Sequence, residues 1–82
     1  MEHFEVGMMA RSKCGHDAKN VYVITAVEDA YVYLVDGKVR TLDKPKKKKK
    51  KHVQLIHKCF DINGATDVDI KRWVKIWNKE DN

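Results

Sequence analysis

A dense run of lysines is the part of this sequence with the clearest chemical use. Residues 44–51 read KPKKKKKK and hold seven of the 17 Lys and Arg residues, without a single acid. The remaining residues include 10 basic and 12 acidic side chains, so the formal net charge of +5 arises from this one segment. Clustered ammonium groups bind phosphate backbones and release condensed counterions, which makes the binding salt-dependent. Because lysine is a flexible point charge, such binding supplies affinity with little sequence readout.

Three other uses of the lysine run stay open from the sequence alone. It can be a solvated loop that only maintains solubility, a contact for an anionic membrane surface, or a nuclear-import signal. Seven lysines in eight positions are denser than solubility requires, so we favour binding of RNA or another polyanion. Arg11, Lys13, Lys19 and Arg40 are candidates to extend the basic patch, although each alone is also typical of an ordinary surface charge.

Aromatic residues offer a second kind of nucleic-acid contact. Tyr22, Tyr31 and Tyr33 can stack on bases where they are exposed, although packing in the core or at its rim is the commoner role in a small β domain. Tyr31 and Tyr33 are two residues apart, so a strand places them on one face. Trp73 and Trp77 are four residues apart, and a helix would place both against the core.

Metal-binding and catalytic patterns are weak. Cys14 and His16 form one pair and His57 and Cys59 another, and these four ligands would make a tetrahedral zinc site only if the pairs met in space. The spacing is not that of a zinc finger, so we expect buried thiols, surface imidazoles, and neither a metal nor a cofactor. The sequence contains no glycine-rich phosphate loop and no nucleophile with a recognisable base, and 82 residues are too few for a large enclosed active site. We therefore expect a protein that is not an enzyme.

The hydropathy pattern predicts five short strands, at residues 8–13, 21–27, 30–35, 38–42 and 52–56. The second strand, VYVITAV, is typical of a strand covered on both faces. Asp36-Gly37 predicts a type I′ turn between the third and fourth strands. Short strands with tight turns favour a small barrel, which the fifth strand would close. We expect the lysine run to be an extended, mobile loop unless a polyanion neutralises it, because its like charges repel one another.

A change of period near the C-terminal end predicts a helix over residues 67–79. Thr66 is a candidate N-cap, and Asp67 and Asp69 place negative charge in the first helical turn. Apolar residues recur at the i, i+3, i+4 and i+7 positions of this segment, namely Ile70, Trp73, Val74 and Trp77. We expect this apolar stripe to pack on the barrel.

Three stretches match a known family in order and spacing: SKCGHDAKNVYVITAV, AYVYLVDGKVRTL and PKKKKKKHVQ. Together with Val6-Gly7 they resemble the KOW-motif RNA-binding proteins, in particular small bacterial KOW-domain proteins similar to an archaeal-type large-subunit ribosomal protein. The resemblance covers about residues 6–54. It implies an SH3-like barrel. Together with the helix that the periodicity predicts, we expect a mainly β fold: a five-stranded SH3-like barrel over residues 1–60 that includes a basic loop at 44–52, and a helical extension over 61–82. It also implies RNA binding and an association with translation.

One loop departs from the family pattern. Where the family reads G-R-D-K-G-R, this chain has His16 and Asn20 in place of the arginines and Lys19 in place of the second glycine. The loop therefore carries less positive charge than in the family, whereas the lysine run carries more. The candidate RNA-binding residues are Lys13, His16, Lys19, Arg40, Lys44, Lys46, Lys47, Lys48, Lys49, Lys50, Lys51 and His52.

These observations predict a cytoplasmic, monomeric RNA-binding protein. Its expected partner is ribosomal RNA, with ribosomal proteins as further candidates. The N-terminal MEHFEVGMM lacks the long apolar run of a signal peptide, and we expect no membrane contact. The alternative is a protein-interaction adaptor that uses the barrel groove or the Trp-bearing helix.

Overall fold

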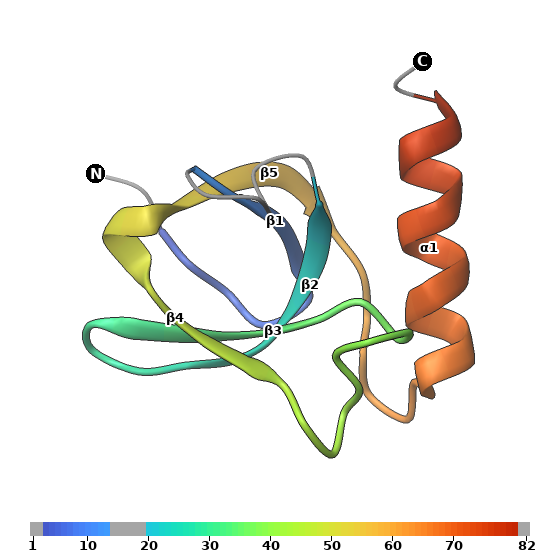
Figure 1. Cartoon of the computed structure of the whole chain (residues 1–82), viewed down its shortest axis with the longest axis horizontal. Coiled ribbons are helices and arrows are strands. Elements are labelled where there is room, and N and C mark those ends of the chain that lie inside the picture. The colour runs from blue at the N-terminus through green and yellow to red at the C-terminus, as the bar shows by residue number, and fades with distance from the viewer. Residues whose placement is uncertain (1–2, 14–19, 81–82) are drawn as a thin grey trace.

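The chain folds as one antiparallel sheet with a helix against it (Figure 1). The computed structural model describes residues 3–13 and 20–80. The elements are β1 (Met8–Ser12), β2 (Val21–Val27), β3 (Tyr31–Val35), β4 (Lys46–Lys49), a 3-10 turn η1 (Lys50–His52), β5 (Val53–Cys59) and α1 (Asp67–Glu80). The strand order is β4-β3-β2-β1-β5. The prediction of a mainly β fold with five strands and a C-terminal helix is confirmed.

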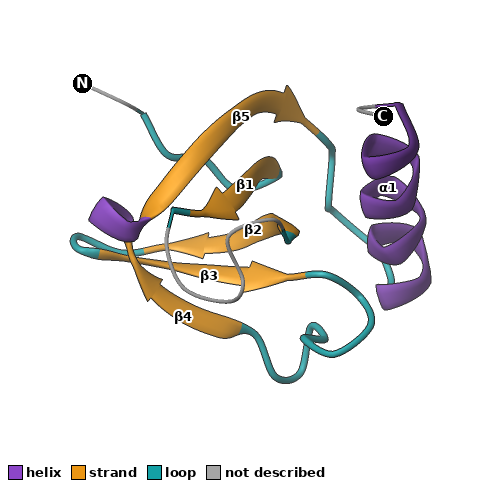
Figure 2. Cartoon of the chain, turned by 45° about the horizontal axis from the view of Figure 1, so that its top comes forward, coloured by secondary structure: helices purple, strands orange, loops and turns teal. Residues whose placement is uncertain are grey.

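The sheet is buried on both faces because its central strand alternates between two hydrophobic clusters. On one face Tyr22 and Ile24 of β2 pack with residues of β1, β3 and β5. On the other face Val21 and Val23 pack with Ile70 of α1 and the rest of its apolar stripe. Figure 2 shows the helix lying along one side of the curved sheet. The predictions of a β2 strand covered on both faces and of a helical stripe packed on the sheet are confirmed.

The sheet is not closed into a barrel, so that part of the fold prediction is wrong. β5 pairs with β1, and β4 pairs with β3, which leaves β4 and β5 as the two edges of the sheet. The turn η1 joins these edges at one end, where Lys50 N donates a 2.9 Å hydrogen bond to Ala30 O. In the described residues no strand ladder continues from this corner between β4 and β5.

The strand predicted at residues 38–42 is a loop. The carboxylate of Asp36 accepts hydrogen bonds from Lys38 N (2.9 Å) and Arg40 N (2.8 Å), and Asp36 N donates to Arg40 O (2.9 Å). These local bonds occupy backbone groups that a strand would use for pairing. Gly37 has a φ of +77°, as expected for a tight turn, but in the described residues positive φ occurs only at glycines. Because a type I′ turn needs positive φ at both central residues, the predicted turn type is wrong.

The helix begins as the sequence predicts. Thr66 Oγ1 accepts from Asp69 N (3.3 Å), and Asp69 Oδ2 accepts from Thr66 N (3.0 Å), which forms a reciprocal capping box. The Asp69 carboxylate accepts hydrogen bonds from Thr66 N and from Thr66 Oγ1 (3.2 Å), and these bonds, with a smaller contribution from the charge of Arg72, lower the pKa of Asp69 below its usual value of 3.8. The loop after β3 is fixed to the same helical turn, because Leu42 N donates to Asp67 Oδ1 at 2.7 Å.

Candidate nucleic-acid interface

The lysine run is a β-strand followed by a 3-10 turn, and not the mobile loop that charge repulsion predicted. Lys46–Lys49 pair with β3 in the register Leu34↔Lys46, Val32↔Lys48, Tyr33↔Lys47 and Tyr31↔Lys49. Successive side chains of a strand point to opposite faces, so consecutive ammonium groups are directed apart and their repulsion is reduced. The run is therefore divided into two sets of lysines with different surroundings.

One set lies with two tyrosines on the face of the sheet that also carries Val35 and α1. We call this surface the tyrosine–lysine face and define it by Tyr31, Tyr33, Lys47 and Lys49, with Glu28 at its border. The tyrosines are half-buried, and both lysines are exposed. The prediction that Tyr31 and Tyr33 share one face is confirmed.

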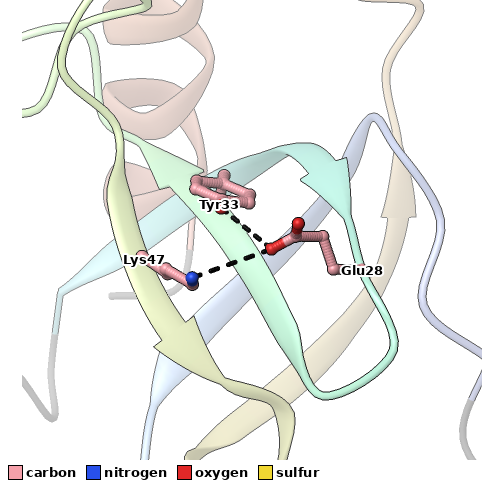
Figure 3. A network of polar contacts seen from close by, with 3 residues as sticks. All are labelled: Glu28, Tyr33 and Lys47. Carbon is pink, nitrogen blue, oxygen red and sulfur yellow. Dashed lines mark hydrogen bonds and ion pairs between the residues drawn. The ribbon is translucent and has the colours of Figure 1, made fainter.

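Glu28 contacts both Tyr33 and Lys47 at this face, as Figure 3 shows. Tyr33 Oη donates a 2.8 Å hydrogen bond to Glu28 Oε1, and Lys47 Nζ lies 3.9 Å from the same oxygen. Lys47 Nζ also lies 4.4 Å from the centroid of the Tyr31 ring and 5.9 Å from that of Tyr33. Exposed cation–π contacts contribute about 0.5–1 kcal/mol, and exposed ion pairs about 0.2–1 kcal/mol. Such weak contacts orient Lys47 without preventing its release to a stronger anion.

The other set of lysines covers the edge of the hydrophobic cluster that contains Tyr22 and Ile24, which we call the inner core. Lys46 and Lys48 are half-buried and lie opposite Leu34 and Val32, which are fully buried. Lys46 Nζ lies 5.8 Å from the centroid of the Tyr22 ring. Their aliphatic stems can shield apolar surface while the ammonium groups reach water. This set has a structural use that the outer pair lacks.

A second group of predicted residues meets at the far end of β4. Lys13 N donates a 2.9 Å hydrogen bond to His52 O, which places Lys13 beside the end of η1. Lys51 is exposed there, and Lys50 is half-buried with Nζ 5.4 Å from the centroid of the Phe4 ring. The structure therefore brings Lys13 together with the end of the lysine run, although the two are distant in sequence.

Two other predicted residues lie at the opposite end of the strand. Arg40 and Lys44 belong to the loop between β3 and β4, which approaches the N-terminal turn of α1 (Figure 1). Both are exposed. The structure therefore does not bring Arg40 and Lys44 together with Lys51 and His52, because the length of β4 lies between them. His16 and Lys19 lie outside the described residues.

The structure also bears on base stacking by Tyr22 and on the zinc interpretation. Tyr22 is only 4% exposed, which rules out base stacking on its ring. Cys59 is exposed, so the expectation that this thiol is buried is wrong. Within the described part of the chain no group of three or more His, Cys, Asp or Glu could hold a metal ion. Cys14 and His16, which the zinc interpretation needs, lie outside that part.

A groove lies between the β3–β4 loop and α1, on the far side of the molecule from η1. It has a volume of about 550 Å³. Its lining residues are Asn20, Val21, Asp36, Lys38, Val39, Lys71, Val74 and Lys75. Val39 is 77% exposed at its rim. Three lysines around apolar side chains favour a ligand that is both anionic and apolar.

Sequence reasoning omitted one residue of the interface, Glu28. It lies in the turn between β2 and β3, where a polar residue indicates nothing beyond solvent exposure. Its contacts with Tyr33 and Lys47 depend on how β4 pairs with β3, which no local pattern specifies.

Comparison with known proteins adds no assignment. No protein-family model matches the chain, and no curated protein is similar to it in sequence. Among the helices of the described residues, none has both the length and the apolar character that crossing a bilayer requires.

Proposed function

We propose that this protein is a non-enzymatic RNA-binding module that holds the phosphate backbone with the exposed lysines of β4 and η1. The observation that carries the proposal is the placement of exposed Lys47 and Lys49 beside two half-buried tyrosines of β3. Lys13 and exposed Lys51 lie beyond them, at the η1 end of the lysine run. Exposed ammonium groups near aromatic rings are the combination that binds nucleic-acid strands in small β domains.

The fold supports a finer version of this proposal. Strands β1 to β4 form a meander, and a 3-10 turn leads from β4 to a fifth strand beside β1. We propose that this sheet is an open form of an SH3-like arrangement. This arrangement agrees with the resemblance to KOW-motif proteins over residues 6–54. On that basis we propose a cytoplasmic protein associated with translation, with ribosomal RNA as its partner.

Protection of a sheet edge is the main structural explanation that competes with RNA binding. Edge strands rich in lysine resist pairing with other chains, and β4 is an edge strand. Protection of an edge requires charged side chains on the strand, but these can lie on either face of the sheet. The aromatic partners of Lys47 favour a binding role for the outer pair in addition to protection.

An RNA-binding measurement with charge variants tests the proposal. We expect wild-type protein to bind labelled RNA in fluorescence anisotropy at low salt, with an affinity that falls as salt rises. Replacing Lys46 through Lys51 by Gln should abolish most of this binding. The double variant Lys71→Gln with Lys75→Gln, which removes two positive charges from α1, serves as the control. RNA affinity that survives the loss of all six lysines would contradict the proposal.

A second candidate function rests on the groove beside α1. Its three lysines and exposed Val39 fit an acidic peptide segment that carries an apolar side chain. In that case the protein would be an adaptor, and Lys71→Gln with Lys75→Gln would weaken peptide binding. Substitutions in the lysine run would then have little effect on the affinity for the peptide.

A further inference from the structure

The geometry points to single-stranded RNA as the ligand, with bases stacked on Tyr31 and Tyr33 while Lys47 and Lys49 bind the adjoining phosphates. This inference rests on the proposed function and names its substrate class. It assigns the tyrosine–lysine face as the place where bases, and not only phosphates, are bound.

The two tyrosines form a small aromatic surface. They are next neighbours on one face of β3, so their Cα atoms are separated by about 6.6 Å, twice the rise of a strand. Both residues are half-buried, so part of each stays accessible to solvent. Tyr33 is held in place by the 2.8 Å hydrogen bond from its hydroxyl to Glu28. An aromatic ring that is anchored and accessible on one side can stack on any base with little loss of side-chain entropy.

The lysines lie where a backbone would follow the stacked bases. Lys49 is paired directly with Tyr31 and Lys47 with Tyr33, on the same face. The lysines therefore repeat along β4 with the same spacing as the tyrosines along β3, and Lys47 Nζ lies near both rings. A base and its own phosphate can be bound together at each of two successive positions along the strand.

Lys47 changes partners when the RNA binds. In the free protein its Nζ lies over the Tyr31 ring at 4.4 Å and near the Glu28 carboxylate at 3.9 Å. A phosphate is a stronger partner than an exposed carboxylate shared with Tyr33, so Lys47 moves to it. This movement leaves the Tyr31 ring available to a base. Glu28 thus positions Tyr33 and also competes with phosphate for Lys47.

Single-stranded RNA fits this surface, and duplex RNA does not. In a duplex the faces of the bases are covered by their neighbours, so a stacking surface gains nothing from them. The affinity for a single strand should therefore exceed that for a duplex, although the duplex carries more charge. A site that uses lysine alone would show the opposite order.

Two ring variants and a chemically altered RNA test the inference. The probe is oligouridylate of about 10 nucleotides, within the range of site sizes of small β domains. It is compared with two other probes: the duplex of oligouridylate with oligoadenylate, and an RNA backbone of the same length that carries no bases. We expect Tyr31→Leu with Tyr33→Leu to weaken oligouridylate binding at least about tenfold, or 1.4 kcal/mol, while Tyr31→Phe with Tyr33→Phe stays within about twofold of the wild type.

The base-free strand needs no variant and therefore keeps the test valid if the leucine protein folds poorly. Wild-type protein should bind it at least about tenfold more weakly than oligouridylate, at the same salt concentration. Ring protons of Tyr31 and Tyr33 should shift on addition of oligouridylate but not on addition of the base-free strand.

The outcomes separate this inference from the proposed function. Equal affinity for the base-free strand and oligouridylate, or preference for the duplex, would overturn stacking while leaving phosphate binding by the lysines intact. Absence of binding to every one of these RNAs at low salt would overturn both.

Discussion

The division of the lysine run between two faces predicts that lysines of equal charge differ in their effect on RNA binding. Two double variants make the comparison within one strand: Lys47→Gln with Lys49→Gln on the outer face, and Lys46→Gln with Lys48→Gln on the inner face. Each removes two charges from β4. Because the outer pair is exposed beside the tyrosines and the inner pair covers the core edge, only the outer change should remove direct phosphate contacts.

The size of the effect follows from counterion release. Each phosphate contact on a single strand contributes about −0.7 to the slope of log K against log salt. Loss of two contacts should therefore reduce the steepness of the slope by about 1.4, and should weaken binding roughly tenfold at about 0.15 M salt. The inner variant should change the slope by less than half as much, through long-range attraction alone.

Fluorescence anisotropy with labelled oligouridylate at several salt concentrations gives both slopes. Thermal unfolding of the two variants serves as a control, because loss of Lys46 and Lys48 removes cover from the inner core. Equal changes in slope for the two variants would refute the reasoning. They would show that RNA responds to the total charge of the segment, and that the face on which a lysine lies is irrelevant.

Three further predictions concern other parts of the structure. Glu28→Gln should tighten oligouridylate binding about two- to fivefold, because an exposed acid that competes for a lysine is removed; unchanged or weaker binding in the same anisotropy assay would contradict that role. Gly37→Ala should lower the free energy of unfolding by about 3 kcal/mol, since φ is +77° and the new Cβ would overlap the backbone of Asp67 and Lys71. Gly64→Ala, with a φ of +79° but open space around it, should cost only about 1 kcal/mol, and equal losses in urea unfolding would refute the claimed close approach. The lowered pKa of Asp69 means that its capping contribution is present above the unfolded-state value of 3.8 and is lost as pH falls through the lower folded-state value, so the melting temperatures of wild type and Asp69→Asn should converge as the pH falls below 3.8; a difference in melting temperature that persists in stronger acid would exclude the capping carboxylate as its cause.

Local patterns in the sequence predict the elements whose stability is local or whose two faces are both apolar. Thr66 and Asp69 specify the helix start because the capping box forms within four residues. The β2 strand is recognisable because both of its faces are buried, so its pattern has no polar interruptions.

The position of β4 could not be predicted because its partner determines it. Lysine has a low intrinsic preference for strands, and a run of like charges suggests a solvated loop. Pairing with β3 overrides both tendencies by providing backbone partners, and it places Lys46 and Lys48 opposite the buried Leu34 and Val32. A slip by one residue in the pairing of β4 with β3 would exchange the outer lysines with the inner ones. The composition of the candidate site was therefore readable from the sequence, but its division between faces was not.

The central claim is that RNA binds at β4, η1 and the adjoining tyrosines. Its most direct test is a titration of ¹⁵N-labelled protein with oligouridylate, observed by NMR. We predict that the largest amide shifts fall in Tyr31–Tyr33, Lys47–His52 and Lys13, and that the groove residues Lys38, Val39 and Lys75 shift little. Shifts concentrated in the groove beside α1, or no shifts at physiological ionic strength, would contradict the claim.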